Sequence, residues 1–258
     1  METDPTRRFA YRADVYARHR PSYPPGLTGL LQRECGLSAN SRVADIGCGT
    51  GLLAERFLEL GCEVFGVEPN AEMRATGARL LAGNPRFHSV DGRAEVTTLP
   101  DAAVDFVTAG QAFHWFEAAA ARVEFGRILK PGGHLVLVWN ERAEGGGFQA
   151  AYDALVRRYA PEVNRVREQD IDRVFGGPVW RLVQLENRQV LDLAGLQGRL
   201  ASSSYAPLEG APGHREMLDA LSGLFATFQV DGRVTLQYDT LIYFGPPAAD
   251  PAPVTGRW

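Results

Sequence analysis

The chain has 258 residues, of which 45% are hydrophobic and 22% are charged, so it can bury one substantial core. Its formal net charge of −4 disfavours nucleic-acid binding, because domains that bind nucleic acids usually carry a strongly basic surface. Its apolar runs fall short of the ~20 residues that span a membrane. We therefore expect neither nucleic-acid nor membrane partners.

The cysteines and the N-terminus predict redox state and location. Cys35, Cys48 and Cys62 are odd in number and lack the spacing of metal ligands, so no metal site is predicted. Residues 1–4 lack the positive charge that begins a signal peptide, and no apolar run follows them. These features predict a cytoplasmic protein with reduced thiols.

The first predicted strand, residues 43–46, runs directly into three alternating glycines, Gly47, Gly49 and Gly51. Such a turn brings bare backbone against a ligand at the edge of a doubly wound sheet. A dinucleotide site usually reads G-x-G-x-x-G and holds a pyrophosphate, which the carboxylate of Asp45 would repel here. The loop instead favours a cationic ligand, and S-adenosylmethionine carries an ammonium and a sulfonium group.

A second acidic residue, Glu68, stands at the end of the next predicted strand, residues 62–67. A carboxylate at this position can accept hydrogen bonds from both ribose hydroxyls. Nicotinamide cofactors use an acid in the same place, about 20 residues after the glycines, so Glu68 does not separate the two kinds of cofactor.

Three further segments continue the alternation of strands and helices. Residues 90–95 follow a third strand and offer a turn for an adenine edge, while residues 99–107 and 129–138 lead into a fourth and a fifth strand. The alternation from residue 41 to 140 predicts a parallel sheet with helices on both faces and a ligand at its carboxyl edge.

In the order and spacing of these five segments, between Val43 and Val138, the chain resembles the class I S-adenosylmethionine-dependent methyltransferases. The resemblance implies an α/β, Rossmann-like fold: a doubly wound, mostly parallel seven-stranded sheet with an antiparallel last strand, an N-terminal helical lid and a small cap. It also implies S-adenosyl-L-methionine as cofactor and S-adenosyl-L-homocysteine as product. Residues 111–116 and 13–24 further resemble the small-molecule group related to trans-aconitate methyltransferase.

The predicted cofactor-binding residues follow the glycine loop, the next two strand ends, the end of the fourth strand and the lid. They are Tyr16, Arg20, Asp45, Gly47, Cys48, Gly49, Gly51, Glu68, Pro69, Met73, Gly92, Ala94, Glu95, Gln111, Ala112 and Phe113. Cys48 has no sequence partner that would make it a nucleophile, so a small buried filler is the better interpretation of its side chain.

The predicted substrate-binding residues come from the lid and from the ends of the fourth and fifth strands. They are Tyr16, Arg20, Tyr23, His114, Trp115, Trp139 and Asn140. His114 and Trp115 are the predicted catalytic residues. Unperturbed histidine titrates near neutral pH, so His114 is a candidate general base, although it can equally shape the pocket. The aromatic rings can contact the sulfonium or simply pack in the core.

An acceptor that is already anionic needs no base, and arginines then become the important residues. Arg18, Arg20 and Arg142 are candidates for a bidentate grip on a carboxylate. The alternative interpretation is a solvated face or a salt bridge within the lid.

We expect one domain, residues 1–245, with a lid at 1–38, a cofactor-binding core at 41–140, and a cap with the C-terminal strands at 141–245. Residues 246–258, rich in proline and alanine, predict a disordered tail. Within the cap region we predict an amphipathic run at 148–159, a short helix and loop at 193–203, a helix at 213–228, strands at 179–191 and 233–244, and a mobile connection at 161–172.

The functional hypothesis is methyl transfer to an oxygen, carboxylate or hydroxyl, of a small-molecule acceptor by in-line displacement, in a monomer or homodimer. Methylation of nitrogen or sulfur is the first alternative. A non-catalytic protein that binds S-adenosylmethionine is the second, and a nicotinamide oxidoreductase is the least favoured. The identity of the acceptor lies beyond these motifs, because lids and caps carry few transferable signals.

Overall fold

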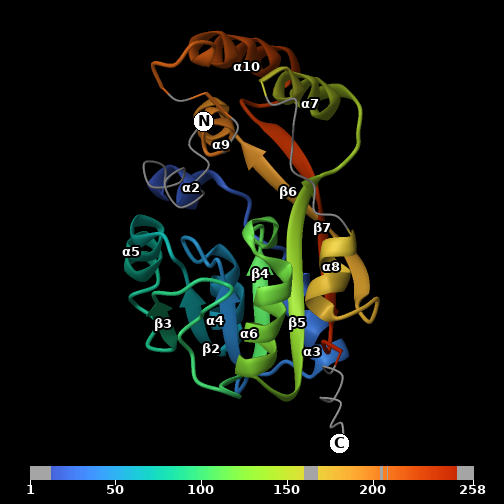
Figure 1. Ribbon diagram of the computed structural model, residues 1–258. Coiled ribbons are helices and arrows are strands. Elements are labelled where there is room, and N and C mark those ends of the chain that lie inside the picture. Colours follow the sequence, from blue (N-terminus) through green and yellow to red (C-terminus); the bar gives the residue numbers. More distant parts are fainter. Residues whose placement is uncertain (1–12, 160–167, 204–205, 208, 249–258) are drawn as a thin grey trace, which may run out of the picture.

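The computed structural model describes residues 13–159, 168–203, 206–207 and 209–248. Its centre is a seven-stranded sheet in the order β3-β2-β1-β4-β5-β7-β6 (Figure 1). The strands are β1 (Arg42–Ile46), β2 (Glu63–Val67), β3 (Phe87–Val90), β4 (Val104–Gly110), β5 (Leu129–Arg142), β6 (Arg181–Leu191) and β7 (Val234–Gly245). The first five pair in parallel, and β7 runs antiparallel to both β5 and β6. The predicted doubly wound sheet with an antiparallel last strand is confirmed.

The chain crosses from β1 to β2 and β3 in one direction and to β4 and β5 in the other. This reversal opens a crevice at the carboxyl ends of β1 and β4, which is where such sheets bind their ligands. Helices α3 (Gly26–Cys35) and α4 (Leu52–Leu60) cover one face of the sheet, while α6 (Ala118–Ile128) and α8 (Glu168–Phe175) cover the other (Figure 1). Helix α5 (Ala71–Leu80) lies beside β3.

The N-terminal region divides between the core and the site. Helix α3 buries Leu27, Leu30 and Leu31 in the same apolar cluster as Val43 and Phe57 of the sheet layer. The predicted lid at 1–38 is therefore too long, since residues 26–35 belong to the core. We use "lid" below for α2 (Ala13–His19) and the loop that follows it to Tyr23.

Strands β6 and β7 extend beyond the end of β5 and carry a second layer of helices. Tyr238 pairs with Arg142, the last residue of β5, whereas Val234 and Leu191 pair with each other further out. Around this two-stranded ribbon lie α7 (Gly147–Tyr159), α9 (Leu193–Ala201) and α10 (His214–Phe228) (Figure 1). The ribbon and these helices form "the cap", and they share an apolar cluster of their own.

The predicted mobile connection at 161–172 is wrong for residues 168–172. Residues 168–175 form α8, which buries Ile171, Val174 and Phe175 against the sheet. Ile171, Val174 and Phe175 stand at i, i+3 and i+4, the spacing of one helix face, so the sequence carried the signal and the surrounding charge led to the wrong interpretation. Residues 160–167 lie outside the described part of the chain.

The predicted tail begins in contact with the fold. The Ala248 N–H donates a hydrogen bond to the Phe175 carbonyl oxygen at 2.7 Å, so Ala248 lies against the end of α8. The rest of the predicted tail, 249–258, falls outside the described residues. Within the described ranges, no helix is both long and apolar enough to cross a membrane.

Candidate active site

The glycine loop after β1 has the backbone geometry that its sequence requires. Gly47 and Gly49 have φ angles of 65° and 58°, in the left-handed region that glycine tolerates best. A Cβ atom on Gly47 would lie only 2.6 Å from the Cβ of Ala112. The Gly47 N–H donates to the carbonyl oxygen of Val67 at 2.9 Å, which ties the loop to the end of β2. Backbone, rather than side chains, therefore forms this part of the crevice.

The Glu68 carboxylate braces this loop from the end of β2. Its Oε2 accepts from the Gly49 N–H at 2.8 Å, and its Oε1 accepts from the Asn70 N–H at 2.9 Å. The side chain of Asn70 in turn caps α5 by accepting from the N–H groups of Glu72 and Met73. Burial raises the pKa of Glu68, and the two backbone hydrogen bonds oppose that shift. Each carboxylate oxygen retains a lone pair for a ligand hydroxyl.

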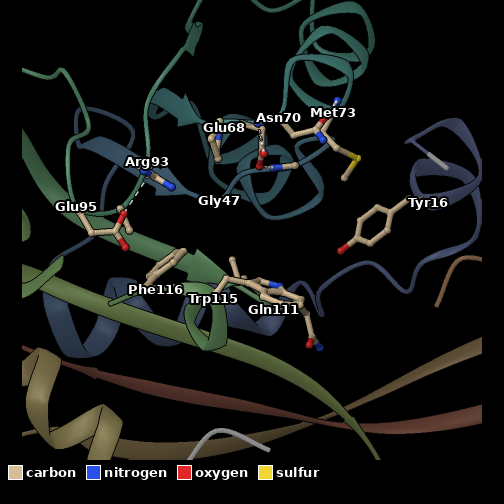
Figure 2. Close-up of a pocket in the computed structure, with 15 residues that line it drawn as sticks. Tyr16, Gly47, Glu68, Asn70, Met73, Arg93, Glu95, Gln111, Trp115 and Phe116 are labelled. Carbon is tan, nitrogen blue, oxygen red and sulfur yellow. Dashed lines mark hydrogen bonds and ion pairs between the residues drawn. The ribbon is translucent and has the colours of Figure 1, made fainter. Parts of the chain in front are cut away.

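A cavity of about 150 Å³ runs along the glycine loop, and we call it the loop cavity. Its lining includes the predicted residues Tyr16, Gly47, Gly49, Glu68, Pro69, Met73, Ala94, Glu95, Gln111, Ala112 and Trp115. Tyr16 enters from the lid, on the side opposite Arg93 and Glu95 (Figure 2). The residues that sequence reasoning missed here are Asn70, Arg93, Gly110 and Phe116. Of these, only Asn70 offered a signal, as a helix cap directly after the strand-end acid.

Several predicted cofactor residues support the loop cavity from behind instead of lining it. Gly51 starts α4 with φ 90°, and a Cβ on Gly92 would lie 2.7 Å from the Thr97 carbonyl oxygen. Phe113 is buried in the core, edge-on to Phe116. Burial raises the pKa of the Cys48 thiol well above its usual range, which agrees with its interpretation as a filler.

Asp45 is buried under the glycine loop and also lies outside the lining. Its Oδ1 accepts from the Thr108 hydroxyl at 3.0 Å, while its Oδ2 has no hydrogen-bond partner among the described residues. Burial raises the pKa of Asp45 to about 7. Positive charge on a ligand at the loop would stabilise the ionised form, so the site fits a cationic cofactor.

A second cavity, of about 350 Å³, lies between the lid and the cap, and we call it the cap cavity. Tyr16 and Gln111 line both cavities, so the two adjoin there. The predicted substrate residues on its wall are Tyr16, Arg20, Tyr23, His114, Trp139 and Asn140. Trp115 lies on the loop-cavity side instead. Sequence reasoning missed Glu141 on β5, Glu144 in the loop after it, and Asp153, Arg157 and Arg199 from the cap.

His114 lies in the single turn Phe113–Trp115 that follows β4. Burial, with a smaller effect of the Arg20 charge, lowers the pKa of His114 to about 4. The imidazole is therefore neutral near pH 7, and it is a much weaker base than an ordinary histidine. Its ring leans on that of Trp115, with the centroids 4.8 Å apart.

Asn140 is the centre of a hydrogen-bond network between the lid and the strands. Its Oδ1 accepts from the Thr240 hydroxyl at 2.6 Å and from Asn187 Nδ2 at 3.2 Å. Its Nδ2 donates to the Ser22 carbonyl oxygen at 3.3 Å, and its own carbonyl oxygen accepts from Gln111 Nε2 at 2.9 Å. This Asn140 network connects β4, β5, β6 and β7 to the lid.

Two of the three arginines predicted for a carboxylate grip, Arg20 and Arg142, line the cap cavity. Arg142 forms an ion pair there with Asp153 of α7. Arg18 is exposed and lines neither cavity. Arg20 lines the cap cavity, with its guanidinium carbon 4.8 Å from the centroid of the Tyr16 ring.

Comparison with known proteins identifies the family. Residues 44–137 match the family described as "Methyltransferase domain". An "uncharacterized methyltransferase" of Mycobacterium tuberculosis is 35% identical over 227 residues, covering 87% of this chain and 88% of that protein. This chain is a class I S-adenosylmethionine-dependent methyltransferase.

More distant similarities are to a named O-methyltransferase and, for the fold alone, to a solved structure. A malonyl-[acyl-carrier protein] O-methyltransferase of Enterobacter lignolyticus is 27% identical to the methyltransferase, over 88% of this chain and 81% of that protein. A solved structure from Anaeromyxobacter dehalogenans, described as a candidate type II methyltransferase, shares the fold with a TM-score of 0.66. It is 23% identical and covers 88% of this chain and 97% of that one. The cofactor of the methyltransferase is S-adenosylmethionine.

Proposed function

We propose that the methyltransferase transfers a methyl group to an oxygen atom of a small-molecule acceptor by in-line displacement. The observation that carries the proposal is the junction of the two cavities at Tyr16 and Gln111. A cap cavity of about 350 Å³ is in the size range of small-molecule sites. S-adenosylmethionine supplies an electrophilic methyl group on a good leaving group, so the protein has chiefly to bind and orient the acceptor.

Residues of the loop cavity have complementary parts in holding the cofactor. Glu68 offers carboxylate oxygens to ribose hydroxyls, and the bare backbone at Gly47 and Gly49 allows close approach. The turn with Glu95 borders the same cavity, and Glu95 Oε1 accepts from the Glu117 N–H at 2.9 Å, which fixes its position. Asp45 favours positive charge from behind the loop.

The environment of His114 favours a carboxylate over a hydroxyl as the methylated group. A hydroxyl oxygen has to lose its proton during transfer, and a base whose pKa is about 4 accepts that proton poorly. A carboxylate oxygen is already anionic and needs no base. We therefore assign His114 and Trp115 to shaping the wall that orients the acceptor. The name of the Enterobacter lignolyticus relative, an O-methyltransferase, also supports oxygen as the acceptor atom.

A product screen tests the proposal. The purified protein is incubated with methyl-labelled S-adenosylmethionine and panels of carboxylic acids, phenols, amines and thiols, and the products are identified by mass spectrometry. We expect a methyl ester from at least one acid, with release of methanol on mild alkaline hydrolysis. Products from amines or thiols alone would support the alternative of nitrogen or sulfur methylation and contradict ours.

A further inference from the structure

Gln111, directly after β4, has a backbone conformation that residues with a side chain seldom adopt. Its φ angle is 55°, in the left-handed region, and this conformation costs free energy for any residue except glycine. The Gln111 N–H donates to the Val138 carbonyl oxygen at 2.9 Å, which holds the strained turn against β5. Residues held in this way are common at ligand sites, and Gln111 lines both the loop cavity and the cap cavity. A glycine would satisfy the backbone without strain, so the side chain needs an explanation of its own.

One hydrogen bond fixes the orientation of the Gln111 amide. Its Nε2 donates to the Asn140 carbonyl oxygen at 2.9 Å, and since a carbonyl oxygen can only accept, the nitrogen has to lie on this side. The amide points away from Glu68 and Gly47, toward the wall of the cap cavity to which Asn140 belongs (Figure 2). The other amide atom, Oε1, has no hydrogen-bond partner among the residues that the structure describes. A neutral acceptor of hydrogen bonds is therefore left for a donor on a ligand.

The Tyr23 hydroxyl provides the complementary group, a neutral donor. Tyr23 is only 6% exposed, and it lines the cap cavity. A Cβ atom on Gly110 would collide with the hydroxyl oxygen, so the hydroxyl lies against the residue directly before Gln111. This hydroxyl also makes no hydrogen bond within the described part of the chain. Burial raises the pKa of Tyr23 well above its usual range, so the hydroxyl keeps its proton and can donate it in a hydrogen bond.

Each of these side chains has a structural explanation when it is considered alone. The Gln111 amide closes the Asn140 network, and the Tyr23 ring packs with Leu27 and Leu53 in the core. Neither explanation uses Gln111 Oε1 or the Tyr23 O–H, and a polar group that is shielded from water without a partner costs free energy. A ligand that donates to the first and accepts from the second would remove both costs.

We propose that the acceptor is an α-hydroxy carboxylic acid, whose hydroxyl donates to Gln111 Oε1 and whose carboxylate accepts from the Tyr23 hydroxyl. This inference rests on the proposed function and names a class of acceptor for it. The Tyr23 hydroxyl lies beside Gly110, next to Gln111, so the two ligand groups have to be close together, as on adjacent carbon atoms. A carboxylate alone would place its lone pairs against those of Gln111 Oε1. An ammonium group is disfavoured as the donor, because the sulfonium of the cofactor would repel it.

Transfer to such an acid requires no proton to move. One carboxylate oxygen forms a bond to the methyl carbon as the carbon–sulfur bond breaks, and the electron pair of the broken bond stays on sulfur. The other carboxylate oxygen accepts from Tyr23, and the α-hydroxyl keeps its proton. Since the carboxylate loses negative charge as the ester forms, the hydrogen bond from Tyr23 does not strengthen in the transition state. Tyr23 and Gln111 thus orient the acceptor, and their replacement should raise KM more than it lowers kcat.

The test compares α-hydroxy acids with acids that lack only the hydroxyl. Lactate, α-hydroxyhexanoate and mandelate, with propionate, hexanoate and phenylacetate as their counterparts, are titrated calorimetrically into the complex with S-adenosylhomocysteine. We expect at least one hydroxy acid to bind about ten-fold more tightly than its counterpart, and its α-methoxy analogue to lose this advantage. Gln111→Met keeps the length of the side chain without the amide and should bring the ratio close to one. Tyr23→Phe should weaken both acids by a similar factor and leave the ratio intact.

Gln184→Met is the matched control, because Gln184 is exposed on β6 and lines neither cavity. Equal binding within every pair, or no binding of any acid, would overturn the inference, as would a ratio that survives in Gln111→Met. If Gln111 only supported the Asn140 network, its replacement would weaken both acids alike. Gln111→Gly is a second variant that accepts the left-handed φ without strain and should also abolish the ratio. The proposed function fails separately: the hydroxy acid would then bind with the expected ratio and yield no methyl ester with S-adenosylmethionine.

Discussion

The loop cavity and the cap cavity meet at two residues, yet they are built in opposite ways. Apart from Tyr16, the loop cavity takes its lining from residues 47–116, at successive strand ends, and much of it is backbone. The cap cavity takes side chains from Tyr16 to Arg199, on the lid, the start of α4, the turn after β4, strand β5 and two cap helices. A site for an invariant cofactor can thus be encoded locally, whereas the acceptor site depends on the assembled chain.

The largest expected effect is on cofactor binding and comes from a substitution in the loop cavity alone. Gly47→Ala puts a Cβ into a left-handed residue and 2.6 Å from Ala112, so the loop has to move. We expect the Kd for S-adenosylmethionine to rise about 100-fold by calorimetry, from strain of about 1–3 kcal/mol together with the lost fit. Gly83→Ala, where a Cβ would meet nothing within 4 Å, is the control and should leave the Kd unchanged. Equal effects of the two substitutions would refute this account of the loop.

A smaller effect is expected on acceptor binding from a substitution beside the cap cavity. Thr240→Val keeps the shape of a buried side chain but removes the 2.6 Å hydrogen bond to Asn140, at a cost of about 1–2 kcal/mol. We expect an increase of about ten-fold in the KM for the acid found in the product screen, an unchanged Kd for S-adenosylmethionine, and rescue by Thr240→Ser. Thr235→Val, exposed on the same strand, should be silent. If Thr240→Val lowered the melting temperature but left the KM unchanged, the Asn140 network would have only a structural role.

The pH dependence of cofactor binding sharpens the comparison further. Bound positive charge favours ionised Asp45, whose pKa in the free protein is about 7. Affinity for S-adenosylmethionine should therefore rise up to about ten-fold between pH 6 and 8, and Asp45→Asn should remove this slope. Acceptor binding in the cap cavity should lack this pH dependence. A slope that persists in Asp45→Asn would contradict the role of Asp45 in cofactor binding.

The raised pKa of Asp45 also predicts how the free energy of unfolding depends on pH. Its folded pKa is raised from 3.8 to about 7, so between these values the native state holds a proton that the unfolded chain has lost. The contribution of Asp45 to the free energy of unfolding should thus be largest at low pH, decline as pH rises through this window, and level off above it. Urea denaturation of the natural protein and Asp45→Asn at several pH values measures the difference.

The smallest expected effect concerns the contacts that attach the lid to the cofactor-binding side and to the cap. On the cofactor side, Asp14 and Arg79 form an ion pair at 2.5 Å whose side chains are 75% and 62% exposed. On the cap side, Gln189 Nε2 donates to the His19 carbonyl oxygen at 2.9 Å. Exposed ion pairs contribute about 0–1 kcal/mol, so Asp14→Asn should barely change the melting temperature or either Kd. A several-fold change in cofactor affinity would show that the ion pair positions Tyr16.

The difference between the cavities also explains what the sequence could predict. The glycine loop, Glu68 and Gln111 lie in or directly after strands, so periodicity and turn chemistry placed them at one sheet edge. Arg199 carries no such signal, because a single arginine in a short amphipathic helix ordinarily faces solvent. Only the pairing of β6 with β7 brings α9 over the lid.

Strand register limited the prediction of the fold in a similar way. The last two strands were predicted within about two residues of β6 and β7. Their sequences do not reveal which half pairs with β5 and which half carries the cap, since both halves alternate apolar and polar residues. Register depends on partners far away in the chain, and local pattern cannot supply it.

The register of β6 and β7 has a consequence for how this enzyme can acquire new acceptors. Asn187 and Tyr238 pair with each other at the level where β5 ends, so everything between them is an elaborated hairpin. The two ends of this segment, at Asn187 and Tyr238, lie side by side where they leave the sheet. Helices α9 and α10 can therefore be exchanged for other segments while every strand below keeps its neighbours, which gives evolution, or an engineer, a replaceable module for acceptor choice above a constant cofactor platform.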